Sequence, residues 1–165
     1  MSWLSAIALG RAGDSRQATS LAGNLSKRFP EDTIAQLDYL PAIHAAAALR
    51  NGDTGKAIEA LVAAAPYELG LGSSLYPVYL RGETYLVAKQ GTAAAIEFQK
   101  ILEHSGVVAN ELIGALAHLQ MGRAFALSGN TSNARTAYQE FFTLWKDADP
   151  DIPILKQAKA EYAKL

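Results

Sequence analysis

Histidine is the residue type in this sequence best suited to acid–base or metal chemistry. The three histidines are His44, His104 and His118, and no two of them lie within two helical turns of each other. A metal site needs three or four converging ligands, which this spacing does not supply. The sequence therefore predicts no metal site and no cofactor.

Carboxylates cluster once, at Asp147, Asp149 and Asp151, in a spacing that a cation site would use. The run lacks the glycine and the distal glutamate of a calcium-binding loop. Its alternation with Ala148 and Pro150, just before a helical segment, is typical of a turn followed by a helix cap. We therefore interpret these carboxylates as turn residues, with Asp151 capping the last helix.

Motifs for nucleophilic catalysis are missing. There is no cysteine and no Gly-x-Ser-x-Gly elbow. An all-helical enzyme whose site combines His118, Glu83 and Arg123 is a distant alternative, because no spacing ties these residues into a nucleophile–base pair. The sequence predicts that this chain has no catalytic residues and is not an enzyme.

Composition narrows the class of protein further. The chain has 165 residues, of which 50% are hydrophobic and 19% are charged, as expected for a folded domain rather than a disordered segment. Fifteen basic and sixteen acidic residues give a net charge of −1, and the basic residues form no stripe, so nucleic acid is not an expected partner. The apolar stretches are shorter than the roughly 18 residues of a membrane span, which predicts no direct membrane insertion.

The elements that would position any site follow from an internal repeat. A glycine followed by a polar residue recurs at spacings of 39, 39 and 38 residues, as Gly13-Asp14, Gly52-Asp53, Gly91-Thr92 and Gly129-Asn130. An alanine follows each pair, namely Ala18, Ala57, Ala95 and Ala134. Glycine accepts the left-handed backbone that ends a helix, and the polar residue caps the next one. Each pair therefore predicts a tight turn between two antiparallel helices.

Helical periodicity places helices on both sides of these turns. They are expected near residues 2–12, 15–29, 33–50, 54–65, 75–90, 92–104, 109–128, 131–147 and 152–164. Pro41 should kink its helix or delay the start of that helix. Residues 66–74 are either a flexible joint or an ordered connector packed under Tyr67 and Leu69.

The last expected helix has one apolar and one polar side. Leu155, Ala158 and Tyr162 form the apolar stripe, whereas Glu161 and the lysines are expected to face water. A stack of repeats leaves an apolar face uncovered at its end, and a helix with one polar side covers it. The segment is therefore predicted to be a cap.

Several positions of the repeat point to a known family. The fourth unit carries Gly122, Phe125, Gly129, Ala134 and Tyr138, the third carries Gly82 and Tyr85, and the first ends with Phe29-Pro30. In this pattern the units resemble tetratricopeptide (TPR) repeats, although they are longer than the 34 residues typical of that family. The resemblance implies one all-α domain over residues 1–165, a right-handed superhelical solenoid of about four antiparallel helix pairs. The units would span about 1–32, 33–70, 75–105 and 109–148, with a capping helix at 152–165.

Five stretches support a narrower resemblance, at residues 29–33, 39–41, 65–70, 97–102 and 144–151. They are similar to the C-terminal TPR region of acidobacterial serine/threonine protein kinases. The resemblance implies an interaction or sensory region of a bacterial signalling kinase, or a stand-alone relative, on either the cytoplasmic or the extracytoplasmic side of a membrane-anchored kinase. The sequence has no Gly-rich loop, no His-Arg-Asp and no Asp-Phe-Gly, so kinase activity would belong to another part of such a protein.

The TPR resemblance also implies a binding groove on the face lined by the first helix of each pair. The groove positions carried over are Trp3, Ile7, Arg11, Tyr39, Arg50, Tyr76, Tyr79, Glu83, Leu119 and Arg123. Arginine and aromatic residues dominate many interfaces, which favours a protein or peptide partner, its identity unknown. The lysines and asparagines with which one TPR subclass holds a C-terminal carboxylate are absent here.

Two alternatives to such a groove stay open. The tyrosines can simply pack against neighbouring helices, as buried aromatic residues commonly do. The array can also serve self-association, because its end repeats can stack and a near-neutral charge does not oppose a homo-oligomer.

Overall fold

All regular secondary structure in the described part of the chain is helical, as the sequence predicts. The computed structural model describes residues 3–70, 72 and 74–165, and no β-strand occurs within these ranges. The helices are α1 (Trp3–Ala12), α2 (Ser15–Arg28), the π-helical turn η1 (Ala35–Tyr39), α3 (Leu40–Arg50), α4 (Thr54–Val62), α5 (Tyr76–Val87), α6 (Gly91–Glu103), α7 (Ser105–Val108), α8 (Leu112–Leu127), α9 (Thr131–Leu144) and α10 (Pro153–Tyr162). The expected helix at 2–12 includes Ser2, which lies outside the described residues.

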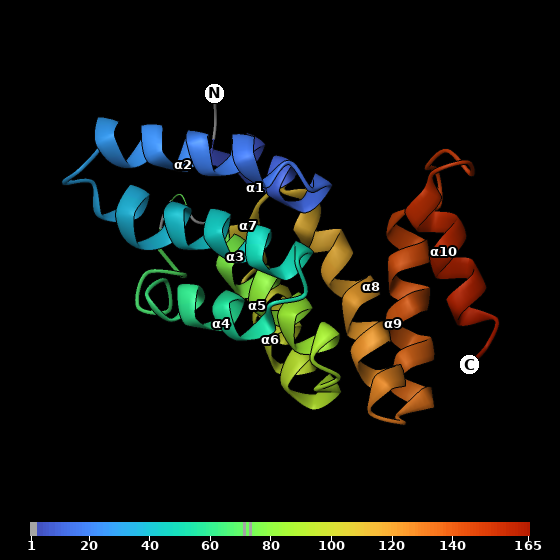
Figure 1. Ribbon diagram of the computed structural model, residues 1–165. Coiled ribbons are helices and arrows are strands. Elements are labelled where there is room, and N and C mark those ends of the chain that lie inside the picture. Colours follow the sequence, from blue (N-terminus) through green and yellow to red (C-terminus); the bar gives the residue numbers. More distant parts are fainter. Residues whose placement is uncertain (1–2, 71, 73) are drawn as a thin grey trace.

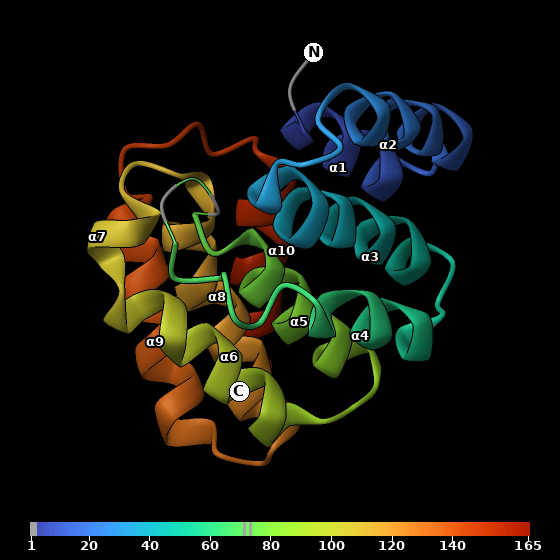
Figure 2. The same ribbon diagram turned by 90° about the vertical axis from the view of Figure 1, so that its left-hand side faces the viewer.

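Neighbouring helices in the chain are also neighbours in space. The helices pair as α1–α2, α3–α4, α5–α6 and α8–α9, and the first helix of each pair packs on the first helix of the next. The second helices α2, α4 and α6 also contact the following pair. The molecule therefore runs from α1 and α2 at one end to α9 and α10 at the other (Figure 1). The turned view shows α1 to α4 on one side of the molecule and α6, α7 and α9 on the other (Figure 2).

Each pair turns at a corner built by the same backbone hydrogen bond. At all four corners an N–H donates to the carbonyl five residues earlier: Asp14 to Leu9, Asp53 to Ala48, Gln90 to Tyr85 and Asn130 to Phe125. Gly13, Gly52 and Gly129 precede this donor at three of the corners and have positive φ angles of 97°, 76° and 76°. These three corners thus end the first helix through the left-handed glycine that the repeat predicts.

The third corner lies two residues earlier than predicted. Lys89, not Gly91, has the left-handed backbone there, with φ of 62°, and Gly91 is the first residue of α6. Gly91 is instead needed for close packing against α8, because a Cβ on it would lie 2.6 Å from the carbonyl oxygen of Ala124. The buried alanine that follows this corner is accordingly Ala94 and not Ala95.

Small residues let the two helices of a pair approach closely. A Cβ on Gly82 of α5 would lie 2.6 Å from the ring of Phe98 on α6, and one on Gly122 of α8 would lie 2.7 Å from the ring of Tyr138 on α9. Both rings are buried at 2% exposure or less. The large side chain of the second helix therefore fills the space that the missing Cβ leaves on the first.

Pro41 lies within a helical backbone that is continuous from residue 33 to residue 50, the range that the sequence predicts. The preceding turn η1 is π-helical, and the N–H of Leu40 donates to the carbonyl of Ala35. Proline has no N–H to donate to the preceding turn, so it interrupts the regular hydrogen-bond pattern of a helix. The expectation that Pro41 delays the start of its helix is wrong, because the backbone is already helical from residue 33 and widens into a π-helical turn just before the proline.

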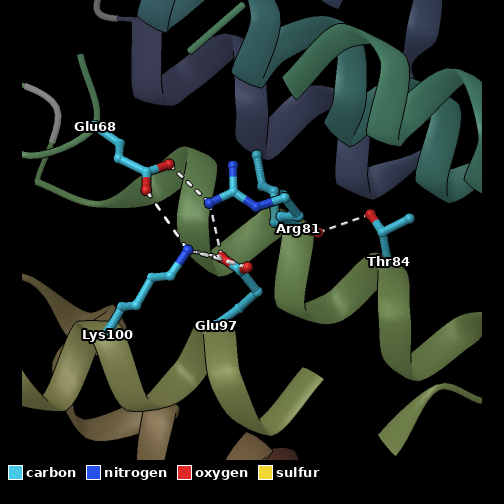
Figure 3. A network of polar contacts seen from close by, with 6 residues as sticks. Glu68, Arg81, Thr84, Glu97 and Lys100 are labelled. Atoms are coloured by element: carbon cyan, nitrogen blue, oxygen red, sulfur yellow. Dashed lines mark hydrogen bonds and ion pairs between the residues drawn. The ribbon is translucent and has the colours of Figure 1, made fainter. Parts of the chain in front are cut away.

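The connector between α4 and α5, which the sequence left open as a flexible joint or as a segment packed under Tyr67 and Leu69, is tied to α5 and α6 by a buried ion network. Leu69 is 54% exposed, whereas the Glu68 carboxylate lies 2.7 Å from an Arg81 nitrogen. The same nitrogen is 2.7 Å from Glu97 of α6, and the Lys100 ammonium approaches both carboxylates (Figure 3). Two positions of the expected joint at 66–74, namely 71 and 73, lie outside the described residues.

The C-terminal helix α10 packs against α9, as a cap would. Leu155 and Ala158 are buried, in agreement with the apolar stripe. The prediction that Asp151 caps this helix is wrong, because Ile152 occupies the N-cap and no side chain accepts a hydrogen bond there. The Asp151 carboxylate instead lies 2.6 Å from the Lys156 ammonium.

Candidate binding groove

A surface hollow of about 600 Å³ crosses the first helices of all four pairs and ends at α10. It lies near the C-terminal ends of α1, α3 and α5 and beside the middle of α8. Its walls are formed by Arg11, Ala46, Leu49, Arg50, Glu83, Leu86, Val87, Lys89, Gln120, Arg123, Gln157 and Glu161. We refer to this set of residues as the groove.

One wall is fixed by a polar network that joins α1, α5 and α8. The Arg11 guanidinium holds the Glu83 carboxylate through two nitrogens, one of them at 2.9 Å. Gln120 donates to both Glu83 at 3.1 Å and the Tyr79 hydroxyl at 3.0 Å. Burial opposes the charge on Arg11, but Glu83 outweighs this effect and raises the pKa of the arginine, so Arg11 stays charged beside Glu83.

The opposite end is closed by Glu161 of α10, which the sequence analysis expected to face water. The Arg123 guanidinium of α8 donates to both Glu161 oxygens, at 2.8 and 3.0 Å. The Tyr138 hydroxyl donates to the same carboxylate at 2.8 Å. Burial raises the pKa of Glu161, but these hydrogen bonds outweigh that effect and lower the pKa below its ordinary value. Glu161 therefore fastens α10 to α8 and α9.

Two cations between these networks have no carboxylate partner among the described residues. They are Arg50, at the end of α3, and Lys89, at the third corner. A Cβ on Gly13 would lie 3.4 Å from Arg50 Nε, so this side chain lies over the first corner. Apolar side chains accompany them, including Leu49 and Val87, of which Val87 is 51% exposed.

The structure separates the predicted groove residues into three groups. Arg11, Arg50, Glu83 and Arg123 line the groove together. Three more are buried, namely Ile7 at 4%, Tyr79 at 2% and Leu119 at 0% exposure, and contribute to packing. The remaining three, Trp3, Tyr39 and Tyr76, do not line it.

Trp3, Tyr39 and Tyr76 form an aromatic cluster of their own. Trp3 stacks on Tyr39 at 4.3 Å between ring centroids and meets Tyr76 edge-on at 5.2 Å. The Tyr39 hydroxyl donates to the Gly72 carbonyl, and the Tyr76 hydroxyl donates to Glu111. Burial, reinforced by Glu111, raises the pKa of Tyr76 to about 12. These rings therefore pack and bond within the protein, the alternative that the sequence left open for the tyrosines.

Several groove residues were missed by sequence reasoning. Lys89 was overlooked because the glycine pattern placed the third corner at Gly91. Leu49, Leu86 and Val87 are single apolar residues at helix ends, and no local pattern distinguishes such residues from core residues. The contribution of α10 requires knowing how that helix returns to the stack, which its amphipathic pattern does not specify.

The residues of the enzyme alternative do not meet at one site. Glu83 and Arg123 line the groove, whereas His118 lines another hollow on α8 and lies 3.0 Å from Glu140 of α9. Among the described residues, no three histidine, aspartate or glutamate side chains gather in an arrangement that could hold a metal ion. The groove thus offers ion pairing, hydrogen bonding and apolar contact.

Comparisons with protein-family models, with curated proteins and with solved structures gave no match to this chain. Within the described residues, every helix is too short or too polar to cross a lipid bilayer.

Proposed function

We propose that this chain is a TPR-like solenoid that binds a protein or peptide in the groove, as an interaction or sensory region of a bacterial serine/threonine kinase or as a stand-alone relative. The single observation that carries the proposal is that one hollow of about 600 Å³ runs over the first helices of all four pairs. Four equivalent corners, with the same hydrogen bond at each, support the solenoid. The kinase context rests on the sequence resemblance alone.

The composition of the groove suits a peptide. Fixed ion pairs at both ends give it rigid walls, and the exposed Val87 offers apolar area between them. A rigid surface loses little conformational entropy when it binds, so more of the contact energy appears as affinity. We infer that an extended or helical segment of a partner lies across the first helices, as such segments do in other grooves.

Selection from a random-peptide display library tests the proposal. The immobilised chain should enrich a pool of binding peptides, and Val87→Gln should weaken binding of that pool about tenfold, because the apolar contact is lost. The matched control is Val62→Gln on α4, since Val62 is also exposed, at 66%, but lies outside the groove. Each substitution replaces one uncharged side chain by another, so both variants keep the net charge of the wild type.

Two outcomes contradict the proposal. A library that yields no enriched pool would show that the chain is not a peptide-binding module. A pool that is weakened equally by both valine variants, or only by Val62→Gln, would place binding outside the groove.

Self-association is a second candidate function, favoured by an apolar hollow at the α1–α2 end of the molecule. Its lining includes Trp3, Leu21, Leu25 and Phe29, of which Phe29 is 40% exposed. A second copy stacked on this end would cover these side chains. Light scattering over a hundredfold range of protein concentration tests this candidate, and a constant monomeric mass would exclude it.

A further inference from the structure

The groove has a charge opposite to that of the remaining chain. Four cationic and two anionic side chains line it, which gives a local charge of +2. The whole chain carries −1, so the residues outside the groove carry −3. Charge complementarity selects partners and steers their approach, which makes an anionic partner segment the favoured one.

The excess positive charge comes from Arg50 and Lys89. The other two cations are already neutralised, Arg11 by Glu83 and Arg123 by Glu161. No described carboxylate lies within ion-pair distance of Arg50 or Lys89. These two side chains are therefore the groove cations that can accept carboxylates from outside the chain.

Lys89 is a costly residue at its position. It has a left-handed backbone, with φ of 62°, where the other three corners have glycine. A residue with a Cβ is disfavoured in this conformation, so glycine would be the more stable choice. A helix-dipole role does not require this position, because a cation in the last turn of α5 would interact with the dipole equally well.

Each of the two cations stands beside an exposed or half-buried apolar side chain. Leu49 precedes Arg50 at the end of α3, and Val87 lies two residues before Lys89 at the end of α5. This arrangement matches a segment in which an apolar side chain is flanked by acidic ones. The apolar side chain would lie between Leu49 and Val87, with the carboxylates on Arg50 and Lys89.

We propose that the groove binds a partner segment carrying an apolar residue flanked by aspartate or glutamate side chains, held by Arg50 and Lys89. This inference rests on the proposed function and names the chemistry of its ligand. The anchoring groups are side-chain carboxylates, so a free C-terminus is not required.

The experiment uses the enriched peptide pool and the full chain. The enriched peptides should be rich in Asp and Glu around an apolar residue. A synthetic, C-terminally amidated copy of the most abundant peptide should bind less tightly as NaCl rises from 50 to 500 mM, because salt screens exposed charges. The double variant Arg50→Gln with Lys89→Gln should weaken its binding about thirtyfold.

The matched control removes two cations outside the groove. Arg16→Gln with Lys27→Gln on α2 makes the same change of net charge, and neither residue lines the groove. This control should leave the affinity of the peptide within about twofold of the wild type. A further variant, Lys89→Gly, should raise the midpoint of thermal unfolding and yet weaken peptide binding, a combination that a merely structural lysine would not produce.

The outcomes separate this inference from the proposed function. An enriched pool that depends on Val87 but is neutral or basic would overturn the acidic ligand and leave peptide binding intact. Equal losses in the groove and control double variants would also overturn it, as would displacement of the peptide by single-stranded DNA at lower concentration than by the unlabelled peptide. Failure to enrich any pool would overturn both claims.

Discussion

At the scale of single residues, the four corners share one backbone hydrogen-bond arrangement. At each corner the same N–H makes the same hydrogen bond. The residue before the donor is glycine at the first, second and fourth corners and Lys89 at the third corner. The corner geometry therefore tolerates a side chain at this position, at a cost in backbone energy. The affected side chain belongs to the groove, where we propose that it contacts the partner.

Opposite substitutions at two corners should shift stability in opposite directions. Lys89→Gly is expected to raise the free energy of unfolding by about 1 kcal/mol, and Gly129→Ala is expected to lower it by about 1 kcal/mol. Gly129 has φ of 76° and open space around its missing Cβ, so only backbone strain acts there. Urea unfolding measures both, and a stabilising Gly129→Ala would show that the corner does not constrain the backbone.

At the scale of helices, glycines pressed against aromatic rings set the distance within a pair. Gly122→Ala should lower the free energy of unfolding by about 1–3 kcal/mol, because its Cβ would overlap the buried Tyr138 ring. The control is Gly23→Ala on the exposed side of α2, where no atom lies within 4 Å of the new Cβ. That change should instead stabilise the protein by about 0.5–1 kcal/mol, since alanine favours helices. Equal effects of the two substitutions, measured by urea unfolding, would contradict the packing described for α8 and α9.

The buried ion network attaches the connector to helices α5 and α6. Arg81→Met leaves the carboxylates of Glu68 and Glu97 without their guanidinium partner and should cost about 3 kcal/mol of unfolding free energy. Limited proteolysis should then cut the connector first. Adding Glu68→Gln and Glu97→Gln to the same variant should recover most of the loss, because no uncompensated buried charge remains. A variant that stays as stable as the wild type with Arg81→Met alone would contradict the network.

Sequence reasoning predicted the longer helices and three of the four corners because both depend on local chemistry, but it missed the short helix α7 between α6 and α8. Gly13, Gly52 and Gly129 mark corners because glycine readily adopts the left-handed backbone that ends a helix. The third corner was misplaced because Gly91 is required by close packing against α8, a helix that is distant in the sequence, and not by the corner itself. The groove was predicted only in part, because its residues come from segments that are distant in the sequence. Arg11 and Glu83 are 72 residues apart, and no local pattern shows that they meet.

At the scale of the whole molecule, Glu161 links the C-terminal helix to the stack and makes that link sensitive to pH. Its pKa is lowered in the folded protein, so its contribution to stability is present above its ordinary pKa of 4.5. That contribution is lost as the pH falls through the lower folded value. Glu161→Gln should therefore reduce the loss of stability between about pH 5 and pH 3, measured by urea unfolding at several pH values.

The exposed Glu31 provides a control for that titration. Glu31→Gln removes an equal charge outside the groove and should leave the pH dependence close to that of the wild type. An unchanged pH dependence in Glu161→Gln would show that the contact with Arg123 and Tyr138 does not hold α10 in place.

Across the whole chain, the account depends on one face being used for binding. The first helices of the four pairs form the groove, while the second helices α2, α4, α6 and α9 contribute none of its lining residues. A partner in the groove must therefore change the environment of the ends of α1, α3 and α5, of the third corner and of the middle of α8. The outward surfaces of the second helices should remain unaffected.

Nuclear magnetic resonance of the ¹⁵N-labelled chain, titrated with the selected acidic peptide, measures this most directly. We predict amide shifts concentrated at Leu49, Arg50 and residues 86–89, with smaller shifts near Gln120. Shifts concentrated on α2, α4, α6 or α9, with the groove amides unchanged, would contradict the account.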